Sequence, residues 1–255
     1  MTLWLRFAHD GANGFGTLEN ETINLHQGDM FAGARPTGKT LSLAAVTVLN
    51  PCTPSKLIAL WNNFRAAAEK NGNPIPAEPL YVIKAPNSYL APGGVIRTPA
   101  SYNGRVIYEG EIGVVIGKRA RGVSIDDADA HIFGYTCVND VTALDVVTRY
   151  PTFPQWTRSK SFDSFGAFGP VIATGMDVSG LSIQTLLNGR ERQNYPVSDM
   201  IFDPRALVSM LSHELTLEPG DIISCGTSLG AGPMRPGMSV EIAIDGIGVL
   251  KNSFE

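Results

Sequence analysis

The order of hydrophobic and polar residues along the chain predicts a protein made mainly of β-strands. From residue 79 onward apolar and polar residues alternate, and turns rich in glycine, proline and asparagine divide the alternating stretches. A short apolar run at 57–60 (LIAL) is typical of a buried strand. The last stretch, SVEIAIDGIGVLKN, predicts a hairpin that turns at Asp245 and Gly246. The pattern favours an α+β, β-dominated fold with a few helices outside a mixed sheet.

Three stretches carry the start and stop signals of helices. The first would run from a cap at Asn63 to a stop at Gly72, and the second from a cap at Ser124 to a stop at Gly134. The third begins at Asp203, whose side chain can cap a helix, and continues with the apolar spacing of a helix with one buried face. We therefore expect short helices between the strands.

The composition changes near residue 54, and this divides the chain into two predicted domains. Residues 1–54 contain short strand-like pieces between turn signals, and they end in NPCTPSK, where two prolines break the pattern. The whole chain of 255 residues is 44% hydrophobic and can bury a substantial core. We expect a small N-terminal β-rich domain, 1–54, and a larger domain, 55–255.

The charge and the cysteines exclude several classes of function. The net charge is −4 and the 20 Lys and Arg residues are scattered, so nothing indicates binding to nucleic acid or to an anionic membrane. No apolar run reaches 18 residues and the N-terminus lacks a signal-peptide pattern, which favours a cytoplasmic protein. Cys52, Cys137 and Cys225 lie far apart, so we expect reduced core thiols rather than disulfides or a zinc site.

Two glutamates interrupt an otherwise apolar stretch, RVIYEGEIGVVIG, at 105–117. Because side chains alternate across a strand, Glu109 and Glu111 would lie on one face, about 7 Å apart. Such a pair can face solvent, pair with arginines or bind a hard cation. The same face continues through Gly113 and Val115, which are small and apolar. This argues against solvent and leaves room near the charges.

A third acid and a lysine extend this group. Asp140 comes at the end of a strand-like run, from which its side chain can project toward a site or cap a helix. Three carboxylates suit Mg²⁺ or Mn²⁺, which prefer oxygen ligands. None of the four histidines has a ligand spacing with these acids, which disfavours zinc. Lys160 lies in a loop rich in glycine and aromatic residues, where a solvated lysine would be ordinary.

Several motifs together resemble the fumarylacetoacetate hydrolase (FAH) family. YEGEIGVVIGKRARGVS, GYTCVNDVTALD and QWTRSKSFDSFGAFGPVIATG follow one another in the order found in that family. PLYVIKAPNSYLAPG and LEPGDIISCGTSLGAGPMRPGMSVEIAIDGIGVLKN extend the resemblance over 55–255, and the first fifty residues resemble the small domain that often precedes it. The resemblance implies a FAH-type mixed β-sandwich roll, which usually forms a homodimer.

The resemblance also implies the roles of five residues. Glu109, Glu111 and Asp140 would bind a divalent metal, Mg²⁺ or Mn²⁺, while Lys160 would lie in the active site. Thr227 stands in GTS, where the family usually has GTP. By the resemblance it would hold the carboxylate of a small anionic 2-oxo acid substrate.

The chain departs from the family in the short helix that covers the site. Many members carry N-Y-x-x-H-x-x-E there, with a His and a Glu that activate water, but this chain reads NFRAAAEK and places Ala67 and Lys70 at those positions. Glu69 lies one residue off, about 100° around the helix. Leu144 stands where the family usually has an arginine. Since AAAEK has little apolar surface, we also expect 62–72 to be more mobile than the strands.

These features predict a divalent-metal-dependent enzyme of small 2-oxo or 2-hydroxy-dienoic acids from ring-cleavage catabolism. A metal can stabilise an enolate. Hydrolysis of a C–C bond needs an activated water in addition, so the missing pair favours isomerisation or decarboxylation, although Lys160 or a metal-bound hydroxide could replace it. The sequence leaves open a C–C hydrolase of acylpyruvate or fumarylpyruvate type, a metal-binding member without turnover, and acids that serve only as ion-pair partners.

Overall fold

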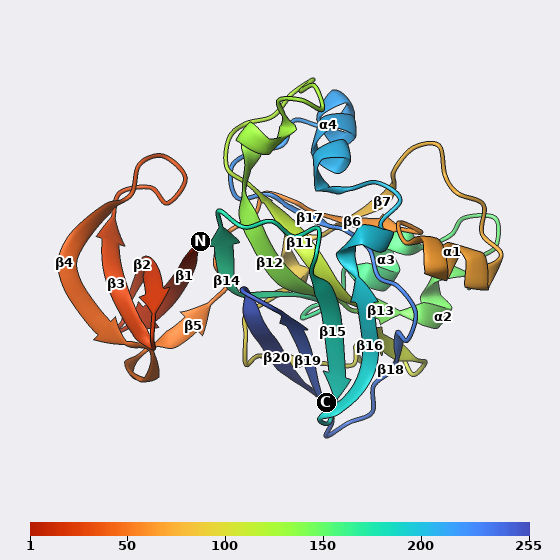
Figure 1. Ribbon diagram of the computed structural model, residues 1–255. Helices are drawn as coiled ribbons and strands as arrows, with labels where there is room; N and C mark the ends of the chain where they lie inside the picture. The colour runs from red at the N-terminus through yellow and green to blue at the C-terminus, as the bar shows by residue number, and fades with distance from the viewer.

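The computed structural model describes residues 1–255, and Figure 1 shows a small β-unit beside a larger body. Strands make up most of the regular structure and form three sheets, whereas the four α-helices are short. The predicted fold class, α+β and β-dominated, is confirmed. None of the helices is long and apolar enough to span a membrane.

The largest sheet begins with the N-terminal unit, an antiparallel meander. Its elements are β1 (Thr2–His9), β2 (Ala12–Glu19), β3 (Thr22–Gln27), β4 (Arg35–Ser42), the 3₁₀ turn η1 (Leu43–Ala45) and β5 (Thr47–Leu49), which pairs with β1. The edge of β1 opposite β2 pairs with β5 and, nearer the N-terminus, with β14 (Gly166–Thr174), where Trp4 lies opposite Ile172. The sheet therefore continues across the predicted domain boundary.

The same sheet then runs through the larger body in the order β14-β12-β11-β17-β6-β7. Its further strands are β6 (Leu57–Trp61), β7 (Leu80–Lys84), β8 (Tyr89–Leu90), β11 (Gly110–Ile116), β12 (Ile132–Asp140) and β17 (Ile222–Ser224). All seven residues of β11 are buried. Both faces of this strand are covered, which explains why its sequence is almost continuously apolar.

A second sheet packs on one face of the first. Its strands are β9 (Val95–Ile96), β15 (Ser182–Leu187), β16 (Arg190–Pro196), β19 (Ser239–Ile244) and β20 (Gly248–Phe254). Strand β20 lies against β14, β19 against β12, and β15 against β11. The predicted hairpin is confirmed, because β19 and β20 pair around a turn at Asp245 and Gly246. A third, small sheet contains β10 (Val106–Tyr108), β13 (Thr142–Ala143) and β18 (Gly232–Pro233). This arrangement is the mixed β-sandwich roll expected from the sequence.

The helices lie around the sheets (Figure 1). They are α1 (Arg65–Asn71), α2 (Leu144–Val147), α3 (Trp156–Lys160) and α4 (Pro204–Glu214), with the 3₁₀ turns η2 (Pro86–Ser88), η3 (Ala128–His131) and η4 (Val197–Asp199). Helix α4 confirms the third predicted helix. The side chain of Asp203 accepts a hydrogen bond from the amide of Ala206 at 2.8 Å, and Leu207 and Leu211 are fully buried.

The second predicted helix, from Ser124 to Gly134, is wrong. The chain forms turns and the short η3 there, and it enters β12 at Ile132. Ser124 does cap a turn, since its hydroxyl accepts a hydrogen bond from the Asp127 amide at 3.2 Å. However, Ala128 is the only buried residue of η3, so the segment has no apolar face that could hold a longer helix against the sheet.

The core lies on both faces of the largest sheet. Ile112 and Val114 belong to the main cluster between the sheets, whereas Val115, Val138 and Phe168 pack in a smaller cluster on the opposite face. All three cysteines are buried and free, as predicted. Burial raises the pKa of the Cys52 and Cys137 thiols to about 12, so these side chains behave as apolar core residues.

Gly134 provides a test of the packing between β12 and β14. A Cβ atom at this position would lie 2.3 Å from the backbone oxygen of Ala173, a contact that no side-chain rotation can relieve. We expect Gly134→Ala to lower the free energy of unfolding by about 1–3 kcal/mol. Gly180→Ala is the control, because a Cβ there meets nothing within 4 Å, and it should change stability by less than about 0.5 kcal/mol. Urea unfolding followed by tryptophan fluorescence measures both, and equal stabilities would contradict this packing.

Candidate active site

Glu109 lies at a break between two strands, which corrects the single strand predicted for 105–117. Strand β10 ends before it and β11 begins after it, and the two strands belong to different sheets. The Glu109 amide donates a hydrogen bond to Oδ1 of Asn139 at 3.1 Å, and its carbonyl accepts one from the Asp140 amide at 2.9 Å. The break is thus tied to the end of β12.

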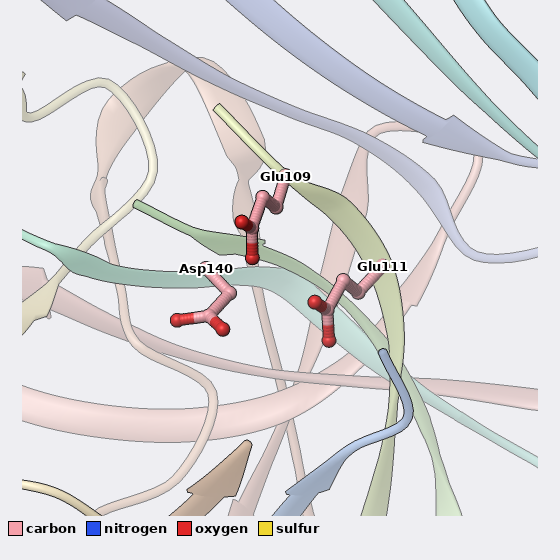
Figure 2. A group of neighbouring side chains, drawn as sticks. All are labelled: Glu109, Glu111 and Asp140. Atoms are coloured by element: carbon pink, nitrogen blue, oxygen red, sulfur yellow. The ribbon is translucent and has the colours of Figure 1, made fainter. Parts of the chain in front are cut away.

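The carboxylates of Glu109, Glu111 and Asp140 come together as predicted, and Figure 2 shows them side by side. One oxygen of each lies within 4.8 Å of the other two. Glu111 and Asp140 are fully buried, and the side chain of Glu109 is 16% exposed. This burial excludes a solvent-facing pair of glutamates. Because Asp140 ends β12 and points into this cluster, it is not a helix cap.

Glu111 uses one of its carboxylate oxygens for hydrogen bonds and leaves the other free. Oε2 accepts from the Ser224 hydroxyl and, at 2.8 Å, from the Gly226 amide. Oε1 is buried without a hydrogen-bond partner. Burial, together with the charges of Asp140 and Glu109, raises the pKa of this carboxyl well above its usual range. An unpaired buried carboxylate oxygen beside two further acids indicates a position for a cation.

Two buried lysines partly neutralise the negative charge of the three carboxylates. Nζ of Lys160, at the end of α3, donates to Glu109 Oε2 at 2.8 Å, to Thr142 Oγ1 at 2.9 Å and to Asp140 Oδ2. Lys84, at the end of β7, donates to the other oxygen of Asp140 and is fully buried. The structure therefore brings Lys160 to the predicted cluster and adds Lys84, which the sequence analysis missed.

The ionisation of these groups follows from burial and mutual charge. Burial alone would lower the pKa of Lys160, but the carboxylates around it, first Asp140 and then Glu109, outweigh burial and raise it. Burial would raise the pKa of Asp140, yet Lys160 and Lys84 outweigh burial and lower it. For Lys84 burial dominates, and its pKa is lowered. Three carboxylates and two ammonium groups leave one negative charge when all are ionised, so the cluster can take further positive charge.

Lys84 could have been found by the reasoning applied to the glutamates. The strand LYVIK is apolar apart from its last residue, and alternation places Lys84 on the same face as the buried Val82. A charged residue on the buried face of a strand needs a partner of opposite charge.

The first predicted helix exists but begins one residue later. Helix α1 follows Phe64, and Gly72 ends it in the left-handed conformation, as predicted. Asn63 is not its cap. The Asn63 side chain is buried and donates to the carbonyls of Cys225 at 2.8 Å and Phe202 at 3.1 Å. Phe64 is fully buried, so the segment has an apolar anchor outside the AAAEK stretch.

Helix α1 contains the two positions of the missing catalytic pair, Ala67 and Lys70. Ala66 and Lys70 are exposed, Ala67 is half-buried and Ala68 is buried. Neither Ala67 nor Lys70 carries a carboxylate or an imidazole, so this helix offers no base at those two positions. The greater mobility expected for 62–72 stays a prediction.

Thr227 lies in the loop after β17, beside the strand that carries Glu111. Its hydroxyl donates to the Gly110 carbonyl at 3.1 Å and accepts from Nε2 of Gln193 at 2.8 Å. Gly110, between the two glutamates, is needed for this close approach. A Cβ atom there would lie 2.0 Å from Oγ1 of Thr185 on the facing sheet. The second sheet therefore covers the face of β11 opposite the Glu111 side chain.

The residues present fit a hard divalent cation. Glu109, Glu111 and Asp140 supply only oxygen donors, and no histidine or cysteine belongs to the cluster. The free oxygen of Glu111 and the remaining negative charge are what Mg²⁺ or Mn²⁺ would satisfy. These three residues would hold the ion.

Comparisons with known proteins agree with this geometry. Residues 56–255 match the family described as Fumarylacetoacetate (FAA) hydrolase C-terminal, and residues 3–51 match the family Rv2993c-like, N-terminal. A crystal structure of 2-hydroxyhepta-2,4-diene-1,7-dioate isomerase from Mycobacterium marinum is 34% identical, with a TM-score of 0.91 over 100% of this chain and 98% of that one.

Two further relatives carry different activities in their names. Oxaloacetate tautomerase YisK from Bacillus subtilis is 37% identical over 212 residues, which cover 78% of this chain and 69% of the relative. Fumarylpyruvate hydrolase from Pseudomonas aeruginosa, solved with Mn²⁺ and pyruvate, is 26% identical with a TM-score of 0.73, over 82% of this chain and 91% of that one. The family match over residues 56–255 shows that the chain belongs to the fumarylacetoacetate hydrolase family of enzymes.

Proposed function

We propose that this protein is a Mg²⁺- or Mn²⁺-dependent enzyme that interconverts the keto and enol forms of small 2-oxo dicarboxylic acids such as oxaloacetate. The observation that carries this proposal is the unpartnered Oε1 of Glu111 in a buried cluster with Asp140, Glu109 and Lys160. A divalent ion bound there would polarise the keto oxygen of the substrate and stabilise its enolate. The 34% identical isomerase and the 37% identical tautomerase support an isomerisation of this kind, and the hydrolase solved with Mn²⁺ supports the metal.

Lys160 has the properties of an electrostatic stabiliser rather than of a base. Its raised pKa keeps it an ammonium ion at neutral pH, with its three donors directed at oxygen atoms. Tautomerisation moves one proton from carbon 3 of the substrate to the keto oxygen, so negative charge develops on that oxygen. The positive charge of an ammonium ion near it lowers the energy of this state. The hydroxyl of Thr227 would hold the substrate's carboxylate.

Hydrolysis of a C–C bond is the second candidate, supported by the fumarylpyruvate hydrolase among the relatives. It requires a base to activate water in addition to the enolate stabilisation. Ala67 and Lys70 stand at the two positions where the family usually has that pair, which favours the tautomerase. The homodimer that the family resemblance implies stays a prediction.

Glu111→Gln tests the metal site. We expect the affinity for Mn²⁺ and Mg²⁺ to fall by about tenfold or more, because one charged ligand is lost. Without metal, the melting temperature should stay the same or rise, since the amide adds no charge to the buried acids. Calorimetric titration and thermal shift with each ion measure both effects. Glu241→Gln is the control, because its carboxylate pairs with Lys251 on another sheet. Unchanged affinity in Glu111→Gln would remove this residue from the site.

Lys160→Met tests the role of the ammonium group. We expect oxaloacetate tautomerisation, followed by the ultraviolet absorbance of the enol, to slow by about 10²–10⁴-fold. Metal affinity should be kept, because the lysine is not a ligand. Lys251→Met removes an exposed lysine that pairs with Glu241 and should leave turnover unchanged. A Lys160→Met protein with wild-type turnover would show that the chemistry does not use this residue.

The double substitution Ala67→His with Lys70→Glu tests why hydrolysis is disfavoured. We expect it to raise metal-dependent cleavage of acetylpyruvate by about tenfold or more, since it restores a possible base to α1. Ala66→His with Lys70→Glu is the control, because Ala66 is exposed and lies about 100° away around the helix. An equal gain in both proteins, or none in either, would show that the missing pair does not limit hydrolysis.

A further inference from the structure

The carbonyl of Gly110 accepts hydrogen bonds from two hydroxyl groups at once. One donor is Thr227 Oγ1 at 3.1 Å and the other is the phenol of Tyr195, which makes a short hydrogen bond. The two hydroxyl oxygens lie 3.4 Å apart. A carbonyl oxygen has two lone pairs and can accept both. Gly110 separates Glu109 from Glu111, so this shared acceptor belongs to the backbone that joins two of the three clustered acids.

The hydroxyl of Thr227 has no spare proton in this arrangement. It has one hydrogen, which it donates to Gly110, and it accepts from Nε2 of Gln193 at 2.8 Å. To bind a substrate carboxylate it must therefore turn its hydrogen away from Gly110. With Tyr195 in place, the buried Gly110 carbonyl keeps a hydroxyl donor when this happens. Without the Tyr195 hydroxyl, the turn of Thr227 toward the substrate would leave the Gly110 carbonyl with no hydroxyl donor.

Gln193 and Tyr195, the hydrogen-bond partners of Thr227 and Gly110, both lie on strand β16 and are buried. Gln193 is 1% exposed, and its Oε1 accepts from the Gly110 amide at 3.0 Å and from Thr185 Oγ1 at 2.9 Å. Tyr195 is 6% exposed, and its ring packs edge-on against Phe64, with ring centroids 4.9 Å apart. The phenol is thus fixed between the start of the covering helix α1 and the strand that carries Glu111.

We propose that Tyr195 is a positioning residue for substrate binding: it holds the Gly110 carbonyl so that the hydroxyl of Thr227 can turn to the carboxylate of a 2-oxo acid. The inference rests on the proposed function, because it takes Thr227 as the carboxylate donor. It assigns to Tyr195 no contact with the substrate and no part in proton transfer. The residue acts through Gly110 and Thr227 alone.

Tyr195→Phe removes the hydroxyl and keeps the ring against Phe64. We expect the dissociation constant of pyruvate, measured by calorimetry on the Mn²⁺-loaded protein, to rise by about tenfold. The KM for oxaloacetate should rise similarly, with kcat and Mn²⁺ affinity changed by less than about threefold. Tyr102→Phe is the matched control. It also removes a buried phenol that donates to a carbonyl, that of Arg105, and it should leave pyruvate affinity unchanged.

A combination with Thr227 distinguishes this role from a general loss of packing. In Thr227→Val the hydroxyl is absent, so adding Tyr195→Phe should weaken pyruvate binding no further. In Thr227→Ser the hydroxyl remains, and the added Tyr195→Phe should cost about tenfold again. Losses that multiply in the valine protein would overturn the proposal, as would wild-type pyruvate affinity in Tyr195→Phe.

The outcomes also distinguish this inference from the proposed function. A wild-type protein that binds pyruvate with Mn²⁺ but does not tautomerise oxaloacetate would refute the reaction. If Tyr195→Phe weakens pyruvate binding even though the protein shows no tautomerase activity, the inference stands. A Mn²⁺-loaded wild-type protein that binds no pyruvate would overturn the inference, because Thr227 would have no carboxylate to receive.

Discussion

The burial of three carboxylates around one point is the constraint on which the rest of the structure depends. A buried charge without a partner would be protonated or would destabilise the fold. Lys84 and Lys160 provide the compensation, and each must reach the oxygens of Asp140 from a different element. The end of β7 and the whole of the short α3 are therefore placed by charge as well as by apolar contacts. A metal ion bound there would neutralise the negative charge that remains.

The same constraint joins the three sheets. Glu109 stands at the passage from the small sheet to the largest one, and Asp140 ends a central strand of the largest sheet. From the second sheet, Gln193 and Tyr195 bind both the amide and the carbonyl of Gly110. Because both polar groups of one glycine are fixed from the facing sheet, the two glutamates beside it have little freedom to separate. The geometry of the cluster is a property of the sandwich and not of one strand.

The sequence predicted those parts of the site that depend on local pattern or on family motifs. Alternation and burial indicated the two glutamates, and the motifs indicated Asp140 and Lys160. Alternation could not show the break at Glu109, because the apolar pattern continues through it and the break depends on the distant Asn139. Nor could it show Gln193 and Tyr195, since β16 is polar on its outer side and resembles an ordinary edge strand. Their role arises only where two sheets meet.

The attachment of α1 separates the stability of the protein from its choice of reaction. The helix is anchored by the side chains of Asn63 and Phe64 and by Asp199, which accepts a hydrogen bond from its first turn at 3.1 Å. Lys70 is exposed, and Ala67 adds only a methyl group to the contacts with the main core. Mutation can therefore insert or remove a water-activating pair within one helical turn at little cost to the fold. Under the proposed function, a few substitutions in α1 would be enough to exchange isomerisation for hydrolysis, or the reverse.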